Sequence, residues 1–195
     1  MPLSDRFSQA LLYALELHSG QTRKASGASY AGHLLRVAGI ALEFGADEDE
    51  AMAALLHDAV EDQGGAETRR EILRRFGRRV AEIVDGCSDT DQLPKPPWRQ
   101  RKEAFLARLR GAGASIRLVC ACDKLDNARS LWSEYRRRGD DLWRHFRGGR
   151  EGSLWYLKSV IEALRAAGGG PGVEELDDAV TRLERLSQTT PGEAP

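Results

Sequence analysis

Apolar residues recur three and four positions apart along nearly the whole chain, which is the spacing that places them on one face of an α-helix. Phe7, Leu11, Ala14 and Leu15 form the first such stripe, and no stretch shows the strict alternation typical of a half-buried strand. With 195 residues, of which 41% are apolar, the chain can bury one core but not the cores of two ordinary domains. The pattern therefore predicts an all-α fold, in the form of a single helical bundle.

Glycine, proline and capping residues divide this pattern into separate helices. Ser4 is the expected N-cap of the first helix, Gly20 ends it, and Asp47 is the expected N-cap of the third. Further helices are expected at about 32–44, 48–62, 67–76, 77–86, 98–110, 115–137, 152–167 and 173–187, with loops at 20–31 and 88–97. We expect a main domain over residues 1–167, a glycine-rich linker over 168–172, and a C-terminal helix with a disordered tail over 173–195.

The charge and composition narrow the class of partner. The formal net charge is -1, so no general attraction to nucleic acid or to an anionic membrane is expected. The longest apolar run, 51–56, is too short to cross a bilayer, and the N-terminus does not resemble a signal peptide. Cys87, Cys120 and Cys122 show no zinc spacing and are expected to be reduced. These features predict a cytoplasmic protein that binds a small molecule.

The segment LLHDAVED at residues 55–62 carries the strongest chemical signal. His57 and Asp58 are adjacent, and Glu61 and Asp62 follow them four residues later. In one continuous helix, His57 and Glu61 would share a face, as would Asp58 and Asp62. Imidazole and carboxylate groups together suit Mn, Fe or Zn, and neighbouring carboxylates can serve as acid or base. The segment predicts metal ligands beside acid–base groups.

Two further candidate ligands lie in other parts of the chain. His33 stands at a loop-to-helix junction, and Asp123 interrupts an apolar helical face, which is costly unless the carboxylate is paired or ligated. Each has an ordinary explanation alone: His33 as a cap or surface residue, and Asp123 as a partner of Lys124 or of an arginine. Together with the His57–Asp58 pair they predict one divalent cation, which can activate a water molecule.

Four motifs, three of which contain these residues, resemble the (p)ppGpp hydrolase domain of the RelA/SpoT-homologue family, a branch of the HD-domain metal phosphohydrolases. The motifs are HSGQTRKASGASYAGHLLRVA at 18–38, LLHDAVED at 55–62, FGRRVAEIVDG at 76–86 and DKLDNARSL at 123–131. They follow the order of the family and span most of residues 10–165. The resemblance implies that residues 1–167 form an HD-type helical domain.

The resemblance also assigns roles to individual residues. It implies that His33, His57, Asp58 and Asp123 hold one Mn²⁺ per chain, and that Glu61 and Asp62 act on water. It further implies three groups of substrate-binding residues: Arg23 and Lys24 on the guanine side; Ser26, Tyr30, Asn127 and Ser130 at the base and ribose; and Lys102, Arg144, Arg150 and Tyr156 around the 3′-diphosphate. For the arginines of the last group, an ordinary solvated surface is an equal alternative.

The expected function is that of a stand-alone small alarmone hydrolase of the stringent response. It would convert ppGpp or pppGpp to GDP or GTP plus pyrophosphate, and without an opposed synthetase it would be constitutively active. Gln63 departs from the family pattern, in which Thr is commoner. The alternatives are hydrolysis of another nucleotide, such as a 5′-nucleotide or NADPH, and a non-catalytic nucleotide-binding module. The helix at 173–187 is compatible with either oligomerisation or capping of the core.

Overall fold

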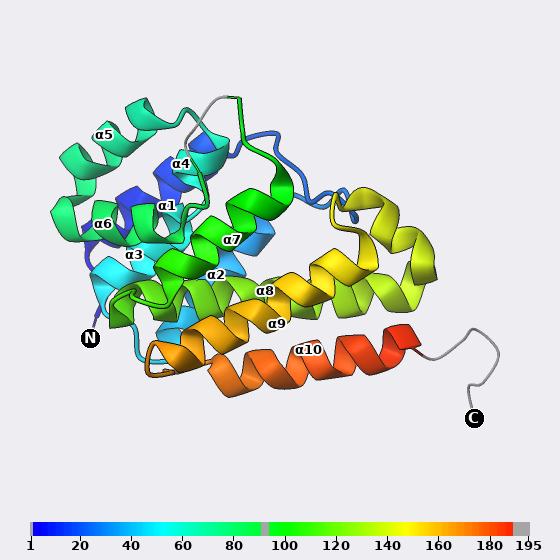
Figure 1. Ribbon diagram of the computed structural model, residues 1–195. Coiled ribbons are helices and arrows are strands. Elements are labelled where there is room, and N and C mark those ends of the chain that lie inside the picture. Colours follow the sequence, from blue (N-terminus) through cyan, green and yellow to red (C-terminus); the bar gives the residue numbers. More distant parts are fainter. Residues whose placement is uncertain (1, 91–93, 189–195) are drawn as a thin grey trace.

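The computed structural model describes residues 2–90 and 94–188, and within these ranges the all-α prediction is confirmed. Apart from one isolated β-bridge between Thr22 and Ser29, every regular element there is a helix (Figure 1). The elements are α1 (Asp5–Leu17), α2 (Ala31–Glu43), α3 (Glu48–Leu56), α4 (Ala59–Asp62), α5 (Ala66–Phe76), α6 (Arg78–Cys87), α7 (Trp98–Leu109), α8 (Ala114–Arg138), the 3-10 helix η1 (Gly139–His145), α9 (Gly149–Ala166) and α10 (Val173–Gln188).

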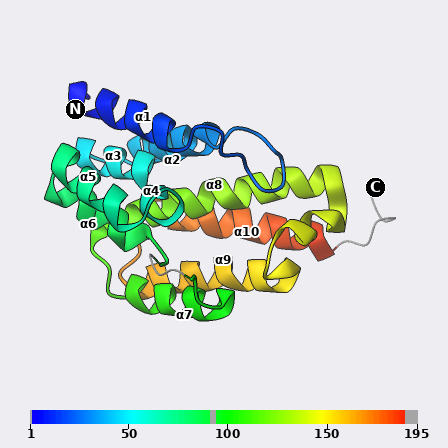
Figure 2. The same cartoon turned by 90° about the horizontal axis from the view of Figure 1, so that it is seen from above.

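The 25-residue helix α8 is the centre of the bundle. It packs against α2, α3 and α6 on one side and against α9 and α10 on the other, and Figure 2 shows α10 running alongside it. Leu34, Leu55, Leu125 and Leu164, which come from four different helices, are all at most 1% exposed. Burial of such a side chain contributes about 1.5–3 kcal/mol, so this apolar centre fixes the position of everything that α8 carries.

Local sequence explains where the first helices begin. The side chain of Ser4 accepts a hydrogen bond from the backbone N–H of Arg6, which confirms the predicted N-cap of α1. Asp47 and Glu50 form a reciprocal capping box at the start of α3, so this predicted cap is also confirmed. The two caps fix the residues at which α1 and α3 begin.

The prediction of one continuous helix over 48–62 is wrong. α3 ends at Leu56, and α4 begins only at Ala59. Asp58, between them, has φ −98° and ψ −3°, which lies in the bridge region rather than in the helical one. Periodicity does not reveal this break, because the buried Ala59 and Val60 continue the apolar pattern of α3. The break leaves His57 and Asp58 in a turn between two helices.

The C-terminal helix packs onto the main bundle. Glycines with positive φ reverse the chain over 168–172, and α10 then buries Leu176, Val180 and Leu183 against α8 and α9. The division into main domain, linker and extension stays a prediction. The predicted tail disorder concerns residues 189–195, and part of the predicted proline-rich loop is 91–93; both lie outside the described residues. No helix of the described ranges has the length and apolarity that crossing a bilayer requires.

The packing of α10 leads to a stability prediction. Leu183 is fully buried, so Leu183→Ala removes apolar contacts and leaves a cavity, which should lower the free energy of unfolding by about 2–5 kcal/mol. Denaturant unfolding followed by circular dichroism measures this change. The matched control is Leu12→Ala, because Leu12 is 68% exposed and should lose little. Equal stability of the two variants would show that α10 does not contribute to the core.

Candidate metal centre

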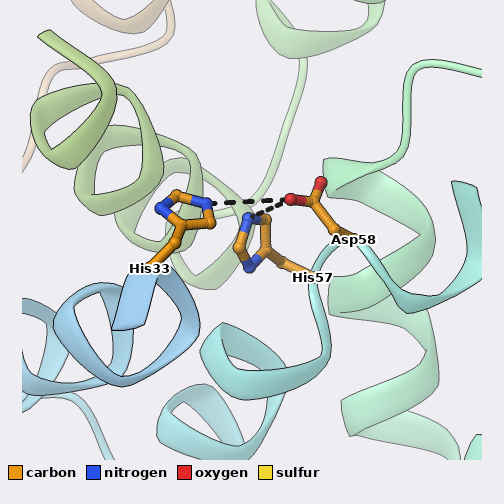
Figure 3. Close-up of side chains that lie close together, drawn as sticks. All are labelled: His33, His57 and Asp58. Carbon is orange, nitrogen blue, oxygen red and sulfur yellow. Dashed lines mark ion pairs between the residues drawn. The ribbon is translucent and has the colours of Figure 1, made fainter. Parts of the chain in front are cut away.

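Two histidines and one aspartate bring possible ligand atoms together between α2 and the turn after α3. His33 comes from α2, and His57 and Asp58 form the turn (Figure 3). The Oδ2 atom of Asp58 lies 3.0 Å from the Nε2 atom of His57 and 3.7 Å from the Nε2 atom of His33. All three atoms are within 4.8 Å of one another, which is a spacing that one cation can bridge.

The other ring nitrogen of each histidine is already engaged. His57 Nδ1 is 2.9 Å from the backbone carbonyl of Ala54, which can only accept, so this nitrogen carries the proton in a neutral ring. His33 Nδ1 is 2.6 Å from Oδ2 of Asp126. Both Nε2 atoms are buried and have no hydrogen-bond partner, a situation that costs about 1–3 kcal/mol per group. Two unpartnered nitrogens facing a carboxylate fit a divalent cation.

Asp123 on α8 adjoins this group. Its Oδ1 atom lies 3.4 Å from Nε2 of His33 and 3.6 Å from Nε2 of His57. The same carboxylate accepts hydrogen bonds from Lys124 and Asn127, at 2.5 Å each. Burial raises the pKa of Asp123, but Lys124 and the two histidines outweigh it and hold the pKa well below its usual value. The four residues predicted as ligands therefore come together, and Asp123 is negatively charged.

Asp126 supports His33 from behind. It is 2% exposed and sits one turn after Asp123 on α8. Besides His33, it accepts hydrogen bonds from Arg36, at 2.5 Å from Nε and 3.2 Å from Nη2. A carboxylate on the distal nitrogen of a ligating histidine fixes the orientation of the ring and raises its basicity. Asp126 is thus placed to aim His33 Nε2 at the cation position.

The two predicted acid–base residues have different surroundings. Glu61 lies 3.2 Å from Lys95 Nζ and accepts from the backbone N–H of Asp89 at 3.4 Å. Burial, together with the negative charge of Asp89, raises the pKa of Glu61, although Lys102 and Lys95 act in the opposite direction. Asp62 instead accepts from the amide of Gln21, at 2.9 Å. These surroundings make Glu61 more inclined to hold a proton than an ordinary glutamate.

Three residues predicted on the nucleotide side do meet. Arg23 donates to Asn127 at 2.8 Å, and its guanidinium lies 5.8 Å from the centre of the Tyr30 ring. The hydroxyl of Tyr30 donates to Oδ2 of Asp58, so Tyr30 also belongs to the metal centre, beyond the base and ribose contact that the resemblance implied. Lys24 is exposed, whereas Ser26 and Ser130 are half-buried.

The predicted diphosphate residues separate into two groups. Lys102 lies 4.6 Å from the centre of the Tyr156 ring and donates to Asp89 at 2.7 Å. Lys124, which was not predicted for this group, lies 5.6 Å from the same ring. Arg144 is instead 84% exposed and faces Asp141 in η1, at 3.3 Å. Arg150 is half-buried in the first turn of α9. The structure thus places two lysines near the ring of Tyr156, and the expected role of the two arginines stays a prediction.

Comparison with known proteins agrees with this geometry. Residues 10–154 match the HD domain family. The chain belongs to the HD domain family. The family-level prediction made from the motifs is therefore confirmed, and so is the expectation that its fold is all-α.

Named relatives of this HD domain are much longer proteins. It is 39% identical over 134 residues to the bifunctional (p)ppGpp synthase/hydrolase SpoT of Escherichia coli K12. The aligned region covers 66% of this chain and 18% of that protein. It is 33% identical over 129 residues to a guanosine-3′,5′-bis(diphosphate) 3′-pyrophosphohydrolase of Aquifex aeolicus, again covering 66% of this chain and 18% of the relative. The HD domain thus spans under a fifth of the length of these curated relatives.

Two solved structures share the architecture of the HD domain. One is described as a metazoan ortholog of SpoT that hydrolyzes ppGpp and plays a role in starvation responses; its TM-score is 0.79 at 27% identity, covering 95% of this chain and 99% of that one. The other is a protein of Listeria monocytogenes EGD-e, with a TM-score of 0.67 at 27% identity, covering 80% of this chain and 99% of that one. The similarity to the first structure includes nearly the whole chain.

Several site residues of the HD domain were missed from sequence. Asp126 lies three positions after Asp123, so helical spacing could have placed it on the same face. His18 and Gln21 fall inside the quoted motif at 18–38, but no local pattern shows what they contact. Lys124 is adjacent to Asp123 and donates to it. The contacts of Lys124 with Tyr156 on α9, and of Lys102 on α7 with Asp89, join distant segments that no local pattern links.

The unpartnered histidine nitrogens lead to a prediction on ligand-linked stability. At a Mn²⁺ concentration about 100 times the dissociation constant, binding should add about 2.7 kcal/mol to the stability of the HD domain. Scanning calorimetry of chelator-treated protein should then show a Tm higher by about 5–10 °C once Mn²⁺ is restored. His57→Ala should lose this gain, and the exposed His145→Ala should keep it. An unchanged Tm in the unsubstituted chain would argue against a cation site.

The contact between Asp126 and His33 yields a second prediction. Asp126→Asn removes the negative charge behind His33, so the affinity for Mn²⁺ should fall about 10- to 100-fold, as measured by titration calorimetry. Asp178→Asn on the exposed side of α10 is the matched control and should bind Mn²⁺ normally. Wild-type affinity in Asp126→Asn would show that His33 needs no orienting carboxylate.

Proposed function

We propose that this HD domain hydrolyses the 3′-pyrophosphate of ppGpp and pppGpp, releasing pyrophosphate and GDP or GTP, with Mn²⁺ as its ion. The observation that carries the proposal is the convergence of the His33 and His57 Nε2 atoms with Asp58 and Asp123. The names of the relatives support the choice of substrate. Since guanine nucleotides are intracellular, the proposal places the protein in the cytoplasm.

The donor set suits the proposed ion. His33 and His57 would contribute neutral imidazole nitrogens, and Asp58 and Asp123 carboxylate oxygens; a mixed nitrogen and oxygen set suits Mn²⁺ better than a thiolate set would. When bound, the ion supplies positive charge that polarises a phosphate oxygen and acidifies water. Asp126 and Ala54 would keep the two Nδ1 atoms occupied, so that Nε2 is the nitrogen available in both rings.

The acid–base roles follow from the surroundings of the two carboxyl groups. Water attacks the 3′-linked phosphorus, the new P–O bond forms, and the bond to the ribose 3′ oxygen breaks. Asp62, whose Oδ2 accepts a hydrogen bond from Gln21 and whose Oδ1 lies 4.0 Å from Lys95 Nζ, would accept a proton from the attacking water. Glu61, whose pKa burial raises, would hold the proton that the ribose 3′ oxygen needs as it leaves.

The remaining charged groups suit the two ends of the substrate. The planar guanidinium of Arg23 would stack on the guanine base, and Asn127 and Tyr30 would contact the ribose side. Lys102 and Lys124, above Tyr156, would hold the departing diphosphate. The edge of the proposed substrate site would be formed by Lys24, Ser26, Ser130 and Arg150.

Product analysis tests the proposed reaction. Incubation of ppGpp with the Mn²⁺-loaded protein should release pyrophosphate and GDP, and a chelator should stop the reaction. NADPH and GMP, assayed under the same condition, should react more slowly; faster turnover of either would favour the alternative of another nucleotide substrate. Asp58→Ala should abolish both turnover and metal binding. Tight binding of ppGpp by the metal-loaded protein without turnover would identify a nucleotide-binding module instead.

A separate prediction concerns Glu61. Glu61→Gln removes the transferable proton without changing the shape of the side chain, and kcat should fall about 100- to 10,000-fold. Metal affinity should stay unchanged, because Glu61 is not among the proposed ligands. Glu103→Gln, at a 57% exposed side chain of α7, serves as the control and should retain full activity. A wild-type kcat in Glu61→Gln would remove Glu61 from the chemistry.

A further inference from the structure

A glutamine amide links three segments beside the metal centre. Gln21 lies between α1 and α2, in the loop closed by the Thr22–Ser29 bridge. Its Nε2 atom donates to Asp62 Oδ2 at 2.9 Å. Its Oε1 atom lies 2.7 Å from His18 Nδ1 and accepts from Gln63 Nε2 at 2.5 Å. The amide thus uses both of its ends, one on a proposed catalytic carboxylate and the other on two supporting side chains.

The chemistry of the partners fixes the orientation of this amide. An ionised carboxylate only accepts hydrogen bonds, so the NH₂ group of Gln21 must face Asp62. The carbonyl oxygen then faces His18, and His18 Nδ1 must be the nitrogen that carries the proton. Burial lowers the pKa of His18, and the hydrogen bond to Gln21 acts in the opposite direction. Because the pKa is lowered overall, the ring is neutral. His18 is therefore an Nδ1–H tautomer with a bare Nε2.

His18 is anchored firmly enough to hold the amide. The residue is 3% exposed, and its Nε2 atom is buried and without a partner. Its ring stacks on Tyr30 with 5.3 Å between centroids and 21° between planes. Tyr30 in turn donates its hydroxyl to Asp58. The support of the Gln21 amide is thus continuous with the metal centre.

We propose that Gln21 is a positioning residue that aims the Asp62 carboxylate for proton transfer, and that His18 and Gln63 set the orientation of its amide. The inference rests on the proposed function, in which Asp62 accepts the proton of the attacking water. The hydrogen bond from Gln21 to Oδ2 fixes the direction of the carboxylate, whose other oxygen, Oδ1, lies 4.0 Å from Lys95 Nζ. Gln63, the residue that departs from the family pattern, acquires a role as the second donor to this amide.

The orientation can be tested without any catalysis. Nitrogen-15 chemical shifts distinguish a protonated ring nitrogen from a bare one. In the metal-free chain, His18 should show a protonated Nδ1 and an unprotonated Nε2. In Gln21→Met, which keeps the length of the side chain but removes all three hydrogen bonds of the amide, this tautomer should lose its preference. An Nε2–H tautomer of His18 in the unsubstituted chain would overturn the inference, whether or not the protein hydrolyses ppGpp.

Kinetics then test whether Gln21 acts through Asp62. Gln21→Met should lower kcat for ppGpp about 10- to 100-fold, with KM and Mn²⁺ affinity changed by less than about twofold. Gln9→Met, at an exposed glutamine of α1, is the matched control and should be fully active. His18→Asn keeps an amide N–H near the position of Nδ1, so it should retain more kcat than His18→Leu.

A double-mutant cycle separates this inference from the proposed function. In an Asp62→Asn background, Gln21→Met should cause no further loss of kcat, because its effect passes through the carboxylate. Additive losses, or a Gln21→Met variant that raises KM alone, would overturn the positioning role. If the unsubstituted, Mn²⁺-loaded chain fails to release pyrophosphate from ppGpp, the proposed function fails, and the tautomer of His18 still decides the orientation of the Gln21 amide.

Discussion

The structure depends on two histidines that each present one unpartnered nitrogen to the same small volume. His57 is turned by the Ala54 carbonyl and His33 by Asp126, so that both Nε2 atoms face Asp58 and Asp123. Both nitrogens are buried without a hydrogen-bond partner, and a cation held between them and the two carboxylates would satisfy both. The rest of the bundle can be understood as the frame that holds this arrangement in place.

Much of that frame is local in origin, and so it could be predicted from sequence. Apolar spacing located the helices to within about three residues, and the caps at Ser4 and Asp47 followed from residue type alone. The turn at Asp58 could not be found in this way, because the buried Ala59 and Val60 continue the apolar pattern of α3 beyond it. The contacts of Asp126 with His33 on α2 and of Lys124 with Tyr156 on α9 form only through tertiary packing. Arg144, an exposed side chain that faces Asp141, keeps its expected role only as a prediction.

The loop between α1 and α2 connects the nucleotide side to the metal side. Its Arg23 reaches Asn127 on α8, and its Gln21 reaches Asp62 in α4, so one short segment touches two separate helices. Tyr30, at its end, donates to the same Oδ2 atom of Asp58 that lies nearest both histidine nitrogens. A carboxylate oxygen can accept one hydrogen bond and still offer a second lone pair to a cation. Displacement of this loop would therefore also change the contact to the oxygen that a cation would bind, and under the proposed function residues 20–30 link the substrate site to the cation site.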